Sequence, residues 1–501
     1  MTGPDEPPAG FGADSRGCFE QLLAWLENGQ TSGLTHAELE DELAGRGREL
    51  LRRMLQDHLS LRTASEPRLT GVTDDAGVVH AAVETGHRRR LASVFGHVQV
   101  ERCAYRHRGH ENLHPADAAL NLPTERHSHG LRRLAAVEST RGSFEQAAAA
   151  LTRATGQQVG KRQVEQLTAR AAVDVADFYA TAARSEPAAD DVLVISADGK
   201  GIVMRPDSLR PATAKAAATT TAKLATRLSK GEKRNRKRLA EVGAVYDLDP
   251  VPRQASDVLA SKRGQHQPPP APKATNKWVT ASVVDDAAEV IAAVFDEAER
   301  RDPDHRRSWV ALVDGNNHQI ERIQTEARTR GVTITIVVDL IHVLEYLWSA
   351  AWSFFTEADP HAETWVHQRA LAILHGHATQ VAAGIRRRAT AAKLSHANRA
   401  KADACAKYLI NKARYLDYPT ALASGWPIAT GIIEGACRHL VADRMDITGA
   451  RWSVDGAEAV LKLRAVRANQ DFETYWRYHL EREHQRVHQS RYANQVIPLA
   501  A

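Results

Sequence analysis

The chain has 501 residues, of which 43% are hydrophobic and 25% charged, and its formal net charge is +5 at pH 7. These values are typical of a folded protein with several domains and exclude a largely disordered chain. No apolar run approaches the ~18–20 residues that span a bilayer, and the N-terminus lacks the pattern of a secretory signal. The four cysteines form no Cys-x-x-Cys pair, which favours a reducing, cytoplasmic location over a disulfide framework.

The N-terminal part is predicted to contain helices followed by a β-hairpin. Residues 1–16 are rich in proline and glycine, and we expect them to be disordered. Within 17–130, amphipathic patterns predict two helices, the second of which opens with a capping box at Thr35–Glu38. Residues 88–105 predict a hairpin that turns at Phe95–Gly96.

The segment after the hairpin contains one cysteine and three histidines. Cys103, His107, His110 and His114 are irregularly spaced, so a zinc ribbon is one interpretation of them. A basic surface loop is the interpretation that this spacing favours.

Residues 131–188 are predicted to form a helix-turn-helix-like region. A helix capped at Ser143 is followed by a glycine-containing break at 156–160 and by a second helix that begins with basic and amide residues. This order suits DNA binding in the major groove, although ordinary helical pairs also occur in any α-rich protein. The residues expected to face the groove are Lys161, Arg162, Gln163 and Gln166.

Three apolar strands that each end in an aspartate dominate the middle of the chain. They are Val192–Asp198, Ser308–Asp314 and Val332–Asp339, and the last two are each followed by a helical pattern. Any one of these aspartates could merely open a turn. Their recurrence in an α/β rhythm instead predicts acids held rigidly at one edge of a sheet.

A basic segment interrupts this region. We expect residues 205–238 to form a loop between two strands of the core, which itself spans 189–349. The cationic side chains of the loop that we expect to contact phosphates are Lys233, Arg234, Arg236, Lys237 and Arg238. A solvated loop without a ligand is the alternative.

The predicted order of elements is that of the ribonuclease-H-like fold. Three strands and a helix are followed by two strand–helix units, and the first two acids fall where that fold keeps them. Residues 350–427 are predicted to form an all-helical insertion, 428–480 the rest of the core with Glu434, and 481–501 a tail. Glu434 and Arg438 have the i,i+4 spacing of a helix-surface salt bridge, which is the structural alternative for that pair.

Five short segments together resemble the ISKra-type bacterial insertion-sequence transposases, which are DDE transposases with motifs similar to those of the Mutator-like group. The segments are Ser196–Lys200, Val313–Gly315, Asp339–Trp348, Gly431–Glu434 and Gly449–Ser453, and the similarity extends from about residue 88 to 480. The resemblance implies catalytic, metal-binding Asp198, Asp314 and Glu434, and it matches Asp339 and His342 to a Cys/Asp-x-x-His motif. Relatives often keep paired cysteines in the segment after Cys103, which this chain lacks.

The expected chemistry is in-line displacement at phosphorus. Three carboxylates can hold two Mg²⁺ ions, with Mn²⁺ as a substitute. Asp339 competes with Asp314 as the second metal ligand. His342 could contact the scissile phosphate or brace the site, Arg438 could support the site, and Trp452 either stacks on a displaced base or belongs to the core.

These observations predict a transposase that binds terminal inverted repeats and target DNA, acts in the bacterial cytoplasm at the nucleoid, and forms a homo-oligomer on DNA. No membrane partner is expected. A ribonuclease-H-like nuclease or resolvase that cuts without joining is one alternative. A DNA-binding protein with a lapsed catalytic core is another.

Overall fold

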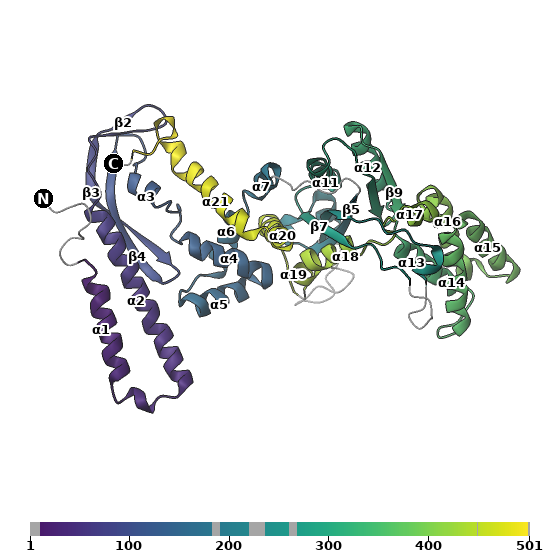
Figure 1. Ribbon diagram of the computed structural model, residues 1–501, viewed down its shortest axis with the longest axis horizontal. Coiled ribbons are helices and arrows are strands. Elements are labelled where there is room, and N and C mark those ends of the chain that lie inside the picture. Colours follow the sequence, from purple (N-terminus) through teal and green to yellow (C-terminus); the bar gives the residue numbers. More distant parts are fainter. Residues whose placement is uncertain (1–10, 183–190, 220–235, 260–267, 448, 499–501) are drawn as a thin grey trace. The chain divides into compact units, whose positions relative to one another are not determined.

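The computed structural model describes residues 11–182, 191–219, 236–259, 268–447 and 449–498 (Figure 1). The chain divides into two compact units. The first unit comprises residues 1–180 together with 471–501, and the second comprises 181–470. No helix in the described part of the chain is long and apolar enough to cross a membrane.

The first unit is mainly helical. Its helices are α1 (Ala13–Glu27), η1 (Thr31–Gly33), α2 (His36–Ala64), α3 (Pro115–Ala119), α4 (His129–Arg141), α5 (Phe144–Thr155), α6 (Lys161–Ala171), α7 (Val175–Thr181), α21 (Phe472–Val487), η5 (Gln489–Arg491) and η6 (Ala493–Gln495). Its strands are β1 (Val72–Thr73), β2 (Val79–His80), β3 (Ala82–Ser93) and β4 (Gly96–Arg106). Helix α1 begins at Ala13, so the predicted disordered segment 1–16 is too long; residues 1–10 lie outside the described part.

The predicted hairpin is present and longer than expected. Strand β3 begins at Ala82, and the pairing of Ser93 with Gly96 makes Val94–Phe95 the turn, one residue before the predicted one. Alternate residues of the hairpin pack on Leu59 of α2 in a small apolar cluster, as the period of two in a strand requires.

Helices α4, α5 and α6 pack against one another. Ser143 and Gln146 form the capping box that opens α5. Gly156 ends α5 in the left-handed conformation, with φ of +69°, which glycine adopts without strain. Helix α6 then begins at Lys161, so the predicted order of helix, glycine turn and helix is present.

The C-terminal helix α21 belongs to the first unit. Its Tyr475 is fully buried and donates a hydrogen bond to the carbonyl of Ala171 at 2.6 Å. From the sequence, 428–480 were expected in the catalytic core and 481–501 in a tail. The second unit instead ends at residue 470, and α21 continues to Val487.

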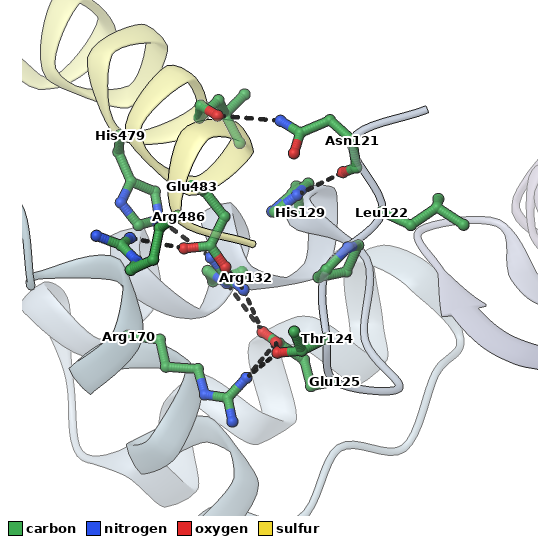
Figure 2. Close-up of polar contacts among 12 residues, drawn as sticks. Asn121, Leu122, Thr124, Glu125, His129, Arg132, Arg170, His479, Glu483 and Arg486 are labelled. Carbon is green, nitrogen blue, oxygen red and sulfur yellow. Dashed lines mark hydrogen bonds and ion pairs between the residues drawn. The ribbon is translucent and has the colours of Figure 1, made fainter. Parts of the chain in front are cut away.

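A buried network of charges joins α21 to α4 (Figure 2). Arg132 has no exposed surface and contacts Glu125 at 2.5 Å and Glu483 at 3.0 Å. His479 contacts Arg132 through Nε2 at 3.1 Å and Asp174 through Nδ1 at 2.7 Å. Because an unpaired buried charge is strongly unfavourable, these contacts fix the position of α21 on the helices it covers.

The second unit combines a sheet with many helices. Its strands are β5 (Val192–Val203), β6 (Lys237–Leu248), β7 (Ala274–Ser282), β8 (Trp309–Val313) and β9 (Ile334–Val338). Its helices are η2 (Pro206–Ser208), α8 (Pro211–Ala218), α10 (Ala255–Val258), α11 (Ala287–Arg301), α12 (Asn317–Arg330), α13 (Leu340–Ala351), α14 (Pro360–Leu374), α15 (Ala378–Ala391), α16 (His396–Lys412), η3 (Ala413–Tyr415), α17 (Tyr418–Ala423), α18 (Gly431–Ala436), the π-helical η4 (Cys437–Ala442), α19 (Asp443–Met445) and α20 (Val454–Ala468).

The five strands form one mixed sheet in the order β7-β6-β5-β8-β9. Strand β6 pairs antiparallel with both β7 and β5, whereas β8 and β9 continue the sheet parallel to β5. The predicted α/β class is therefore confirmed, with a five-stranded mixed sheet in the second unit.

The apolar sequence of β5 explains its central place. Residues 192–195 are at most 3% exposed, as expected of a strand covered on both faces. Beside it in β6, a Cβ atom at Gly243 would lie 2.4 Å from a methyl group of Val294. Glycine at this position therefore lets α11 pack closely on the sheet.

The predicted helical insertion is also present. Figure 1 shows α14, α15 and α16 grouped together on the α13 side of the unit. Helix α16 packs against both α15 and α13, and Arg388 of α15 lies over the rings of Phe354 and Phe355, at 4.8 and 4.6 Å from their centroids. The packing of α16 on α13 attaches the insertion to the helix that follows β9, and the Arg388 contacts hold the insertion together internally.

Candidate active site

The three predicted aspartates follow the mutually paired parts of three neighbouring parallel strands. The ladder between β5 and β8 ends at Ile195 and Ala311. Asp198 lies three residues beyond the last β5–β8 pair, whereas Asp314 and Asp339 directly follow the last β8–β9 pair. The strand order reverses between β5 and β8, and ligands of open α/β sheets bind at such a point, beyond the carboxyl ends of the strands.

The sequence predicted that Asp198 ends its strand. Asp198 instead lies in the middle of β5. The strand continues to Val203 because it pairs with β6 over its whole length. One carboxylate oxygen of Asp198 accepts the Gly199 N–H at 2.7 Å, and the other accepts the Cys437 thiol at 3.4 Å. The carboxylate is only partly buried, so it remains accessible.

Glu241 is an acid beside Asp198 that sequence reasoning missed. It pairs with Gly199 across the β5–β6 ladder. Burial, and then the neighbouring charge of Asp198, raises the pKa of Glu241 to about 7. An acid between the apolar residues Ala240 and Val242 was the available signal, but its partner depends on the register of β6.

Asp314 follows β8 directly. Its Oδ1 accepts the Asn316 N–H at 2.7 Å, and its carbonyl accepts the hydroxyl of Tyr408 from the helical insertion at 3.1 Å. Gly315 has φ of +92°, and a Cβ atom there would lie 2.8 Å from the Tyr408 hydroxyl. Glycine at position 315 is therefore favoured by the close approach of α16 as well as by the positive φ of the turn.

Asp339 is fully buried and forms the N-cap of α13. Its Oδ1 accepts the Ile341 N–H at 2.8 Å, while its Oδ2 lies 3.4 Å from His342 Nδ1 and accepts the Thr430 hydroxyl. Thr430 immediately precedes α18, the helix that carries Glu434. Asp339 thereby ties the end of β9 to the start of α18.

Glu434 completes a compact group with Asp339 and His342. The three offer ligand atoms within 4.8 Å of one another. A hydrogen bond with Asp339 raises the pKa of His342 to about 9, with further contributions from the charges of Asp339, Glu345 and Asp314 and against the effect of burial. The acidic surroundings therefore stabilise positive charge at this point.

The predicted set Asp198, Asp314 and Glu434 does not form such a group. Among the described residues, the metal-capable group at this edge of the sheet joins Glu434 to Asp339 and His342. Asp198 instead lies with Glu241 and with Cys437, which follows Glu434 by three residues in the chain. Of the two aspartates considered as the second metal ligand, it is Asp339 and not Asp314 that is grouped with Glu434.

Arg438 and Trp452 have structural contacts. The exposed Arg438 contacts Asp443 at 3.7 Å; we find no described ion pair between it and Glu434, because the helix widens into the π-helical η4 at Cys437. Trp452 is 5% exposed and donates its indole N–H to the Met445 carbonyl at 3.0 Å. Trp452 therefore belongs to the core, which was the second of the two interpretations of this residue.

The predicted DNA-contacting residues fall into three groups. The first group lies on α6, where Lys161, Arg162, Gln163 and Gln166 are all exposed; Gln163 also caps the Gly160 N–H at 3.0 Å. Lys233 and Arg234 lie outside the described residues. The segment 205–238 is not simply a loop, because it contains η2, α8 and the start of β6.

The remaining basic residues of that segment stand at the start of β6. Arg236 precedes the strand. Lys237 contacts Asp446 at 3.4 Å, and Arg238 donates to the Val283 carbonyl at 2.6 Å. These two cations are thus at least partly engaged within the protein.

Cys103 and His114 do not form part of a zinc ribbon. Cys103 is buried, its N–H donates to Glu66 at 2.8 Å, and its carbonyl lies 3.0 Å from His114 Nδ1. Neither belongs to a metal-capable group within the described ranges.

Comparisons with protein-family models and with curated proteins find no match to this chain.

Proposed function

We propose that this chain is a DDE-type DNA transposase with a ribonuclease-H-like catalytic core. The observation that carries the proposal is that Asp198, Asp314 and Asp339 lie on or directly after the neighbouring strands β5, β8 and β9, with Glu434 grouped with Asp339. The strand order β7-β6-β5-β8-β9, with an antiparallel and a parallel half, supports this core. The short motifs that resemble ISKra-type transposases support the same conclusion.

The donor set fits hard divalent cations. Four carboxylates gather from segments far apart in sequence, and oxygen ligands of this kind suit Mg²⁺ and Mn²⁺. Asp198, Glu434 and one or both of Asp314 and Asp339 would hold two ions, and the imidazole of His342 suits Mn²⁺ better than Mg²⁺. Bound ions of this kind neutralise the charge that develops on phosphate oxygens.

The side chains of the protein then have separate roles. Asp198 is aimed by the Gly199 N–H and the Cys437 thiol, so its carboxylate is held before any ligand arrives. His342 Nδ1 lies 3.4 Å from Asp339 Oδ2, so its ring is oriented within the group that Asp339 and Glu434 complete. On α6 of the first unit, Lys161 and Arg162 are exposed and suited to contact DNA.

A cleavage assay tests the catalytic part of the proposal. The substrate is a DNA fragment that carries the sequences flanking the gene, because inverted repeats there would define a mobile element. We expect strand cleavage with Mg²⁺ or Mn²⁺ and none in excess chelator. Asp198→Asn should lower cleavage by more than about 100-fold, beyond the 10–100-fold cost of removing a residue that only supports a metal ligand. Asp304→Asn is the matched control, since Asp304 is an exposed acid paired with Arg306.

A nuclease or resolvase that cuts without joining is the second candidate. Strand transfer distinguishes the two, because only a transposase would join the cut ends to a target plasmid. Cleavage that persists in chelator, or that survives Asp198→Asn, would overturn the proposed catalytic site. Binding to the repeats without cleavage under any metal condition would indicate a lapsed core.

A further inference from the structure

A second metal-capable group lies in the first unit, apart from the acids of the sheet. Asp74, His80 and His110 offer ligand atoms within 4.8 Å of one another. Asp74 directly follows β1, His80 ends β2, and His110 lies in the loop after β4. Three segments that are separate in sequence thus converge on one point.

Asp74 is oriented by the backbone around it. Its Oδ1 accepts the N–H groups of Ala76 and Val78 at 3.0 and 2.8 Å. Its Oδ2 lies 3.1 Å from His80 Nε2 and 3.1 Å from His110 Nδ1. One oxygen is therefore fixed by the turn, and the other is directed between two imidazole rings.

The environment of His80 points to a cation. Its side chain is 1% exposed, and its Nδ1 lies 3.3 Å from the Tyr105 carbonyl. A carbonyl oxygen only accepts, so Nδ1 donates to it, and Nε2 faces the Asp74 carboxylate. Nε2 and Asp74 Oδ2 are 3.1 Å apart, so either a second ring proton or a metal ion lies between them. A histidine that donates its other N–H to a backbone carbonyl is the usual form of a metal ligand.

His107 extends the group to three imidazoles. Its Nδ1 lies 3.1 Å from the Val79 carbonyl, which leaves Nε2 as the lone-pair nitrogen by the same reasoning. Its ring centroid is 5.9 Å from that of His80 and 5.3 Å from that of His110. The loop thus carries a fourth donor at the rim of the site, outside the three residues whose ligand atoms lie within 4.8 Å of one another.

We propose that Asp74, His80 and His110 bind one Zn²⁺, with His107 as the fourth ligand. Three nitrogens and one oxygen are a donor set of zinc and not of Mg²⁺ or Ca²⁺. A tetrahedron with bonds of about 2.0–2.1 Å has edges of about 3.3 Å, close to the two 3.1 Å separations around Asp74 Oδ2. Only the side chain of His110, at 37%, is substantially exposed among the three, which leaves a path for the ion to enter.

The ion would fasten the β1–β2 turn to the loop after β4 and to the C-terminal segment. Asp74 forms an isolated bridge with Tyr492, and the Asp75 N–H donates to the Arg491 carbonyl at 3.2 Å. A ligand at Asp74 therefore also stabilises the attachment of residues after α21 to the same unit. This role is structural and does not depend on the catalytic proposal.

Metal content of the full chain, purified without a histidine tag, is the first measurement. We expect zinc equal to that of the wild type in His97→Gln, which removes an exposed imidazole on β4. We expect one equivalent less in His80→Ala and in His110→Gln. Because His110 is on the surface, His110→Gln should fold even if His80→Ala does not. The metal content of Glu434→Gln shows how much of the total is held at the sheet of the second unit and not at the Asp74 site.

Cobalt substitution tests direct ligation. After exchange of zinc for Co²⁺, the wild type should show the visible absorption of a tetrahedral centre. His110→Cys should add a thiolate-to-cobalt charge-transfer band, which a remote effect on folding would not produce. Purified and zinc-incubated protein without bound zinc would overturn the proposal, as would zinc content that is unchanged in both His110 variants. His80 and Asp74 would then be a buried imidazolium–carboxylate pair.

Discussion

Arg132 and Arg133 are neighbours on α4 with opposite surroundings. Arg132 is fully buried between Glu125 and Glu483, whereas Arg133 is 44% exposed and pairs with Glu473, which is 71% exposed. We expect Arg132→Met to destabilise the first unit by about 3–5 kcal/mol, because it leaves buried carboxylates without their partner. Arg133→Met should change stability by about 0–1 kcal/mol.

The two variants can be compared by hydrogen exchange of the α4 and α21 amides, which reports the free energy of local opening. Equal protection in both variants would show that the network in Figure 2 contributes no more than a surface pair.

The same network makes the first unit sensitive to acid. Burial opposes ionisation of Asp174, but hydrogen bonds with His479 and Arg486 hold its pKa at about 2. Burial likewise opposes ionisation of Glu483, and hydrogen bonds with Arg486 and Arg132 bring its pKa to about 2. Both values lie below the ordinary ~3.9 and ~4.3 of unfolded Asp and Glu. Ionisation therefore stabilises the fold above about pH 4, and this contribution is lost as pH falls towards 2.

We expect each carboxylate to contribute on the order of 2 kcal/mol at pH 7. Glu483→Gln should be less stable than the wild type at pH 7, and the difference should shrink between pH 5 and 3. Exchange protection of α21 across this range is the measurement. A difference that stays constant with pH would assign the effect of the substitution to packing.

At the residue scale, sequence patterns identified the acids but not the residues that lie beside them in the fold. Asp198, Asp314 and Asp339 were predicted because each ends an apolar run, and the structure places them on or directly after three neighbouring strands of one sheet. Glu241 was missed because its position beside Asp198 follows from the antiparallel register of β6, which no local pattern encodes. Likewise the pairing of Glu434 with Asp339 depends on Thr430, whose bond to Asp339 joins segments 91 residues apart.

At the scale of elements, Gly243 tests the packing of α11 on the sheet. A Cβ atom there would lie 2.4 Å from Val294 and 3.3 Å from Val290 and Thr280. We expect Gly243→Ala to destabilise the second unit by about 1–3 kcal/mol, because an overpacked core must shift side chains and backbone. Gly384 of α15 has nothing within 4 Å of such an atom, so Gly384→Ala should stabilise by about 0.5–1 kcal/mol.

Urea unfolding of both glycine variants measures the two effects. If Gly243→Ala were as stable as the wild type, α11 would be free to move outward at no energetic cost. That result would contradict a sheet whose helix is fixed by close contact.

Elements were predicted well where the pattern was local. Strand β8, the capping boxes that open α2 and α5, and the hairpin of β3 and β4 all follow from periodicity and turn residues. The continuation of β5 beyond Asp198 was not predicted, because Gly199 and Gly201 look like a turn in isolation. Pairing with β6 across the whole strand overrides that local preference.

At the scale of the whole molecule, sequence patterns could not predict which residues belong to which unit. Helix α21 lies 291 residues after α7 in the chain, yet Tyr179 donates to Asp471 at 3.0 Å within the first unit. A tail and a core helix have the same amphipathic pattern, and only the buried partners on α4 and α6 distinguish them. The candidate catalytic acids and the exposed face of α6 consequently belong to different units.

This division predicts that DNA recognition and catalysis can be impaired separately. The described cations Lys237 and Arg238 have partners inside the protein, whereas Lys161 and Arg162 at the start of α6 are exposed. We therefore expect Lys161→Ala with Arg162→Ala to weaken binding to the terminal repeats. The log–log salt slope should fall by about 0.9 for each phosphate that the protein no longer neutralises. Asp198→Asn should leave both quantities unchanged, because it removes no cation.

Arg141→Ala is the matched control, since Arg141 is an exposed arginine at the end of α4 that already pairs with Glu138 at 2.8 Å. Binding titrations at several salt concentrations, with repeat and random duplexes, separate the two kinds of interaction. A slope reduced equally on both duplexes indicates phosphate contacts, whereas weaker affinity for the repeat alone indicates base contacts from α6. If the double variant binds as the wild type does at every salt concentration, the face of α6 does not meet DNA, and recognition must be sought elsewhere on the chain.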